Sequence, residues 1–152
     1  MKARTADVHT AIGQLQRLAD LFHQRRAQLA QGAGLTEAQW EVLERIASEH
    51  FIPSMFARHR ESSAPAVSRI IRQLLRKKLI TVSVSDTDGR QRRYQLTPRG
   101  QKTLDGLRAT RRRAIETVWM GLEPAALATF TEFSSELITR LEAYAGQDEE
   151  DS

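Results

Sequence analysis

Apolar side chains recur at steps of three and four along most of this 152-residue chain. The first such stretch predicts a long amphipathic helix over about residues 7–30, which ends at the glycine-rich break 32–34. Thr36 precedes the next apolar repeat and is the expected N-cap of a second helix. Pro53 predicts the start of a third, short helix over residues 54–60, because proline suits a first helical turn.

The fourth predicted helix has the most regular pattern. Its apolar face consists of residues spaced i, i+3, i+4, i+7 and i+8, namely Val67, Ile70, Ile71, Leu74 and Leu75. Its opposite face carries Ser68, Arg69, Arg72, Gln73 and Arg76. Ser62 or Ser63 is the natural N-cap, and Pro65 fits the first turn. The pattern therefore predicts a helix that buries one face and presents serine and arginine on the other.

From Ile80 the period changes from helical to two, which is typical of a strand. Apolar and polar residues alternate up to Ser85, and they alternate again through Tyr94 and Leu96. Between the two runs, Asp88-Gly89 is a strong signal for a tight turn. These residues predict a β-hairpin.

Two further helices follow the hairpin. Pro98 begins a fifth predicted helix that runs to about Leu122, and Glu123-Pro124 restarts a sixth. The sixth helix carries an apolar stripe, and residues 147–152 are acidic and expected to be disordered. The fold class expected from the whole pattern is mainly α with a small β-hairpin.

Charge is unevenly distributed along the chain. Residues 50–113 contain 16 Lys and Arg against four acids, a net charge of +12, whereas the remainder has seven bases and 15 acids, a net charge of −8. Such asymmetry favours an anionic polymer as the partner of the middle third. A set of solvated faces with local ion pairs is the alternative, although few acids lie nearby in sequence.

Composition and motifs argue against several other classes. The chain has no cysteine, no apolar run long enough for a membrane span and no signal-peptide pattern, so a cytoplasmic protein is expected. His9, His23, His50 and His59 form no close pair, so no metal and no cofactor are predicted. No nucleophile motif or phosphate loop is present, and enzyme activity is not expected.

The order of elements is that of a winged helix-turn-helix, in which one helix enters the major groove of DNA and a hairpin lies beside it. Small and polar residues occupy the first turns of the fourth helix, and arginines flank the hairpin turn, where the narrow minor groove attracts them. The candidate DNA-binding residues are Ser63, Ala64, Pro65, Ser68, Arg69, Arg72, Asp88, Gly89, Arg90 and Arg92.

The stretches LTEAQWEVLERIA, APAVSRIIRQLLRKKLI and DTDGRQRRYQLTPRG resemble the MarR family of bacterial winged-helix regulators. The resemblance covers nearly the whole chain, and it implies a homodimer that binds palindromic operators, commonly as a repressor released by a small ligand. Three departures stand out. Lys78 replaces the usual glycine before the wing strand, Val82-Ser83 replaces a frequent arginine, and Arg60 and Ser62 replace apolar residues.

With this resemblance, four regions are expected. Residues 1–34 form an N-terminal dimerisation helix, 35–100 the winged DNA-binding domain, 101–146 the C-terminal dimerisation helices, and 147–152 an acidic disordered tail. Pairing of two chains would bury the apolar stripes of the outer helices and set two recognition helices about one DNA turn, roughly 34 Å, apart. A helical pair within one chain that covers both stripes is the alternative.

The resemblance also implies a small aromatic or anionic effector. The candidate effector-binding residues are Phe22, His23, Trp40, Arg111 and Trp119. Trp40 and Trp119 lie on apolar stripes, so a plain core role is the favoured interpretation for both tryptophans.

A protein of another class fits the same pattern. Winged helices also serve as docking modules, and in that case the basic face would bind an acidic protein partner. The gathering of arginines on the groove-facing helix and the hairpin tip favours DNA over this alternative.

Overall fold

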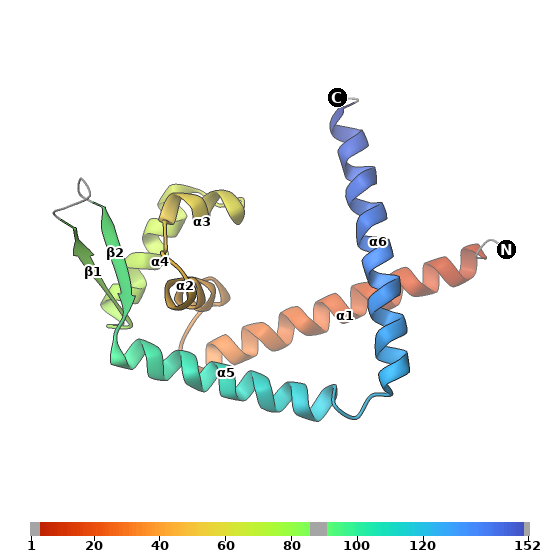
Figure 1. Ribbon diagram of the computed structural model, residues 1–152, viewed down its shortest axis with the longest axis horizontal. Coiled ribbons are helices and arrows are strands. Elements are labelled where there is room, and N and C mark those ends of the chain that lie inside the picture. The colour runs from red at the N-terminus through yellow and green to blue at the C-terminus, as the bar shows by residue number, and fades with distance from the viewer. Residues whose placement is uncertain (1–3, 86–90, 151–152) are drawn as a thin grey trace. The chain divides into compact units, whose positions relative to one another are not determined.

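The computed structural model of the chain describes residues 4–85 and 91–150, and of residues 147–150 it describes the backbone alone. Its helices and strands, in order, are α1 (Thr5–Gly32), α2 (Glu37–Ser48), α3 (Pro53–His59), α4 (Ala64–Arg76), β1 (Ile80–Val84), β2 (Arg92–Leu96), α5 (Pro98–Val118) and α6 (Pro124–Glu150). The expected fold class, mainly α with one small hairpin, is confirmed (Figure 1). The chain divides into two compact units, Met1–Arg111 and Arg112–Ser152.

The predicted N-caps begin the helices that they were expected to begin. The Thr36 hydroxyl accepts a hydrogen bond from the backbone N–H of Gln39 at 3.1 Å, and the Gln39 side chain accepts one from the backbone N–H of Thr36 at 3.1 Å. This reciprocal capping box satisfies two of the free N–H groups at the start of α2. Of the two serines before α4, Ser63 is the cap, and it accepts from the Ala66 N–H at 3.2 Å.

The later helices differ in length from their predictions. α5 ends at Val118, short of Leu122, because Gly121 and the coming Pro124 disfavour helical backbone in this stretch. α6 extends to Glu150 and so includes most of the segment 147–152, which was expected as a tail.

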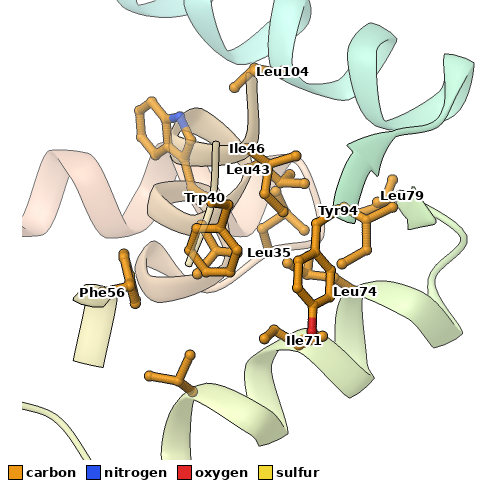
Figure 2. Packing of buried hydrophobic residues seen from close by; sticks show 14 of the residues in the cluster. Leu35, Trp40, Leu43, Ile46, Phe56, Ile71, Leu74, Leu79, Tyr94 and Leu104 are labelled. Carbon is orange, nitrogen blue, oxygen red and sulfur yellow. The ribbon is translucent and has the colours of Figure 1, made fainter. Parts of the chain in front are cut away.

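The hydrophobic core of the first unit lies where α2, α4 and the hairpin meet (Figure 2). Trp40, Leu43, Leu74 and Leu104 are almost fully buried there. β1 and β2 pair in antiparallel register, with Val82 opposite Tyr94. In Figure 2, Tyr94 points from the hairpin toward α4 near Ile71. The hairpin is therefore fixed to the same core as the helix beside it.

In the second unit, α6 has large apolar side chains that are exposed to solvent. These are Leu127, Phe130, Phe133, Ile138, Leu141 and Tyr144. Across the part of the chain that the structure describes, no helix is long and apolar enough to cross a membrane.

The base of the hairpin is fixed against the start of α5. The Thr97 hydroxyl donates to the carbonyl of Lys78 at 2.7 Å and accepts from the N–H of Gly100 at 3.0 Å. The Thr97 N–H donates to the carbonyl of Leu79 at 3.0 Å. A Cβ at Gly100 would lie 2.0 Å from that same carbonyl oxygen, so the close approach requires glycine.

We expect Gly100→Ala to destabilise the fold by about 2 kcal/mol or more, because the added methyl would displace backbone that cannot move freely. Gly106→Ala is the matched control, since this glycine lies in the same helix with open space at its Cβ position. It should stabilise by about 0.5–1 kcal/mol through the better helix propensity of alanine. Urea unfolding of both variants measures the difference, and equal free energies of unfolding would contradict the steric argument.

Lys78 has φ of +57°, in the left-handed region that favours glycine, at the position where the resemblance implies glycine. We therefore expect Lys78→Gly to raise the free energy of unfolding by about 0.5–1 kcal/mol, since the strain relieved exceeds the entropy that glycine adds to the unfolded chain. Lys78→Ala removes the same charge and keeps the Cβ, so it should give no gain. A gain of equal size in both variants would show that charge, and not backbone strain, is responsible.

Candidate nucleic-acid interface

α4 presents its polar face to solvent because its apolar face is fully used in the core. Val67, Ile71 and Leu74 are buried. The predicted contact residues of this helix lie on the exposed side or at its exposed first turn, namely Ser63, Ala64, Pro65, Ser68, Arg69 and Arg72. Small side chains at the first turn leave the helix end open to close approach by a partner.

The turn between α3 and α4 is held despite the polar residues found there. The Arg60 guanidinium donates to the carboxylate of Glu41 on α2. The Ser62 N–H donates to the Ala57 carbonyl at 2.8 Å, and Glu61 adopts φ of +52° to close the turn. An ion pair and a backbone hydrogen bond thus hold the turn where the resemblance implies apolar residues.

The hairpin places Arg92 and Arg93 at its outer end, both exposed. Arg92 pairs with Val84 in the strand register, and the Ser85 N–H donates to the Gln91 carbonyl at 3.1 Å. The predicted tip residues Asp88, Gly89 and Arg90 lie outside the described residues.

A groove of about 560 Å³ separates α4 from the hairpin. It is lined by Ser68 and Arg72 from α4, Arg92 and Gln91 from the hairpin, and an apolar floor that includes Tyr94. Three of the predicted contact residues therefore share one concave surface. Among the described residues that line it, Arg72 and Arg92 carry positive charge and none is a carboxylate.

Sequence reasoning missed one wall of this groove. His50, Phe51, Ile52 and Pro53, from the loop between α2 and α3 and the first residue of α3, also line it, and the Phe51 ring centroid lies 5.7 Å from that of Tyr94. Their spacing carries no periodic or charge signal, and only the folded chain brings them beside α4.

Trp40, one of the candidate effector-binding residues, is a core residue with satisfied polar contacts. Its indole N–H donates to Glu44 at 3.2 Å, and the Arg26 guanidinium lies 4.5 Å from the ring centroid. Glu44 also accepts a bidentate pair of hydrogen bonds from Arg108 of α5, the shorter at 2.6 Å. These contacts connect α1, α2 and α5.

The pKa of Glu44 reflects these neighbours. Burial raises the pKa, but the hydrogen bonds from Arg108 and Trp40 and the charges of Arg108 and Arg111 outweigh it and hold the pKa below its ordinary value. The pKa of Arg108 is raised, chiefly by its hydrogen bond to Glu44. The pair is therefore ionised at neutral pH.

The other candidate effector residues are distributed more widely. Phe22 and His23 lie on the exposed surface of α1, where the His23 Nδ1 is 4.0 Å from Glu37. Trp119 is half-buried in the second unit. Among the described residues, no group of three His, Cys, Asp or Glu side chains lies close enough to hold a metal ion.

Comparison with known proteins bears on the family. The model of the MarR family matches residues 33–91, which hold α2, α3, α4 and β1. No curated protein matches the sequence at a significant level.

Solved structures match over almost the full length. A MarR family transcription regulator is 20% identical with a TM-score of 0.80, and the match covers 93% of this chain and 94% of that one. A Listeria innocua protein of unknown function is 26% identical with a TM-score of 0.71, covering 89% and 95%. The Staphylococcus aureus MepR–DNA complex is 20% identical with a TM-score of 0.64, covering 84% and 93%.

The likeness to these structures establishes the fold, and the family model matches the part that carries the candidate interface. The model of the MarR family thus matches residues 33–91, and solved MarR family transcription regulators share the winged helix-turn-helix fold of this chain.

Proposed function

We propose that the protein is a sequence-specific regulator of transcription that binds double-stranded DNA in the cytoplasm. The observation that carries the proposal is the groove between α4 and the hairpin, where Ser68, Arg72 and Arg92 converge and no described carboxylate intervenes. The fold match to a MepR–DNA complex supports the same partner.

In this proposal the two elements have different roles. The first turns of α4 enter the major groove, where Ser68 and Arg69 reach base edges and Arg72 reaches guanine or phosphate. The hairpin lies over the neighbouring minor groove, where its arginines meet concentrated negative potential. α4 therefore determines which DNA sequence is bound, and the hairpin adds affinity and fixes the position of the protein along the DNA.

The proposed assembly is a homodimer, with residues 1–34 and 101–146 as its dimerisation helices and 35–100 as its DNA-binding domain. The exposed apolar side chains of α1 and α6 support it, since Phe22 and Phe133 are 55% and 56% exposed in a single chain. A second copy would remove this surface from water. Two recognition helices related by a two-fold axis then fit a palindromic operator.

Repression, and release from the operator by a small aromatic or anionic ligand, complete the proposal. A docking module for an acidic protein is the second candidate, because the same positive groove would also accept acidic side chains. The rows of exposed arginine on both α4 and β2 favour a long, regular anionic partner, which is what DNA provides.

We expect Arg69→Ala to weaken binding to the selected duplex by about 1–3 kcal/mol and to change binding to random DNA much less, because a base contact is lost. Arg92→Ala should weaken both alike and reduce the slope of log K against log salt by about one. Duplexes selected from a random library, followed by fluorescence anisotropy at several salt concentrations, measure both effects.

Arg45→Ala is the matched control for these two variants, since Arg45 lies on α2 and pairs with Glu49. It should leave affinity and salt slope unchanged. A wild-type protein that prefers no duplex over random DNA, or that binds without salt dependence, would favour the docking module.

We expect the wild-type protein to sediment at twice the chain mass at micromolar concentration. Phe133→Glu combined with Leu141→Glu should shift it to the monomer, because buried carboxylates oppose association. Ser135→Glu combined with Thr139→Glu adds the same two negative charges at exposed polar positions of α6 and should leave the mass unchanged. A monomeric wild type would contradict the dimer, and loss of the dimer in the control alone would place the interface on another face.

A further inference from the structure

A buried amide connects the far end of α4 to the start of α2. Gln39 is 3% exposed and is a buried polar residue in a core that is otherwise apolar. Its amide nitrogen donates to the side-chain oxygen of Gln73 on α4 at 2.8 Å. Its amide oxygen accepts from the Thr36 N–H at 3.1 Å and from the Lys77 ammonium at 3.0 Å.

Lys77 extends this network to the turn between α1 and α2. Its ammonium also donates to the carbonyl of Gly34 at 2.6 Å. Gly34 has φ of +71°, a conformation that suits glycine, and this turn presents its carbonyl to the lysine. Gln73 of α4 and the C-cap residue Lys77 thus make three directional hydrogen bonds, two to the Gln39 side chain and one to the Gly34 carbonyl, in addition to the apolar packing of α4.

Directional bonds matter here because apolar packing alone does not fix an angle. Hydrophobic burial is non-directional, so Val67, Ile71 and Leu74 resist separation of α4 from the core more than small rotations of it. A hydrogen bond weakens steeply when its angle is lost. The bonds to Gln73 and Lys77 therefore define the direction in which α4 points.

The first turn of α4 lies far from the hydrogen-bond network, so a small change of angle at the network moves that turn by a larger distance. From Ser63 to Gln73 the helix rises about 15 Å, so a tilt of roughly 4° at the network moves the first turn by about 1 Å. Direct contacts to base edges tolerate about 0.5 Å. A small loss of orientation at Gln39 is therefore enough to disturb base contacts, whereas phosphate contacts by flexible arginines would survive it.

We infer that Gln39 is a positioning residue for sequence recognition, which sets the aim of α4 through Gln73 and Lys77 without touching DNA. The inference rests on the proposed function. It predicts that loss of the network lowers discrimination between DNA sequences more than it lowers general affinity for DNA. The loss of discrimination should also be larger than the lower stability of the variant can explain.

The test compares the affinity for the selected duplex with the affinity for random DNA, measured well below the melting temperature of each variant. Gln39→Met keeps the length and burial of the side chain and removes all of its hydrogen bonds. We expect the ratio of the two affinities to fall about tenfold, while affinity for random DNA stays within about twofold.

Lys77→Met and Lys78→Met form a matched pair of variants. Each removes one positive charge at the end of α4, but only Lys77 belongs to the network. The ratio of specific to random affinity should fall for Lys77→Met and stay unchanged for Lys78→Met. This pair also carries the test if Gln39→Met does not fold, since Lys77 is only half-buried.

Gln73→Glu provides a conservative rescue. A carboxylate keeps an oxygen acceptor for the Gln39 amide, so the ratio should stay near that of the wild type although both affinities fall through the added negative charge. Gln73→Met removes the acceptor and should lower the ratio.

The outcomes separate the inference from the proposed function. A wild-type protein with no preference among duplexes overturns both. A wild type with a clear preference, together with Gln39→Met and Lys77→Met variants that melt earlier but keep the ratio within about twofold, overturns the inference alone and leaves Gln39 a purely structural residue.

Discussion

The candidate interface depends on the way α4 divides its two faces. Leu74 and Val67 are almost completely buried in the core, and this packing leaves Ser68, Arg69 and Arg72 on the outer surface. The hydrophobic effect supplies the energy of the contact, and the period of 3.6 residues converts it into an orientation. The arginine face is therefore a consequence of core packing.

The hairpin is subject to a tighter constraint than the helices. Its base is held where Thr97 bridges the Lys78 carbonyl and the Gly100 N–H, and only glycine allows the approach of α5 to Leu79. Tyr94 fastens the middle of the hairpin to the core. A rigid base and middle allow Arg92 to remain beside α4, so that helix and hairpin form one surface.

Much of this arrangement follows from local patterns in the sequence. The spacing of Val67 to Leu75, the change of period at Ile80 and the cap at Thr36 each rest on short-range geometry, and the structure confirms all three elements. The end of α5 was placed too late, because the breaking effect of Gly121 competes with an apolar stripe that continues to Leu122. Element type is a local property, whereas an exact end is a balance of small terms.

The parts that the sequence did not predict are those created by contacts between distant segments. His50 to Pro53 reach the groove only because the loop after α2 folds beside α4, and no motif marks them. Likewise, the sequence marks Gln39 only as a residue near the start of a helix. In the structure its side chain bonds the Thr36 N–H, Gln73 of α4 and the C-cap residue Lys77 at once.

A buried polar group is costly unless it is hydrogen-bonded. The Gln39 side chain makes three hydrogen bonds, one with the Thr36 N–H before its own helix and two with Gln73 and Lys77 at the end of α4. Satisfaction of this kind is possible only in one relative placement of α2 and α4, whereas leucine at the same site would tolerate many. The main effect of the Gln39 amide is therefore to disfavour other placements of α4 against α2, and its contribution to stability is the smaller effect. In a protein whose proposed task is to distinguish one DNA sequence from others, such exclusion is the property that the reading helix needs.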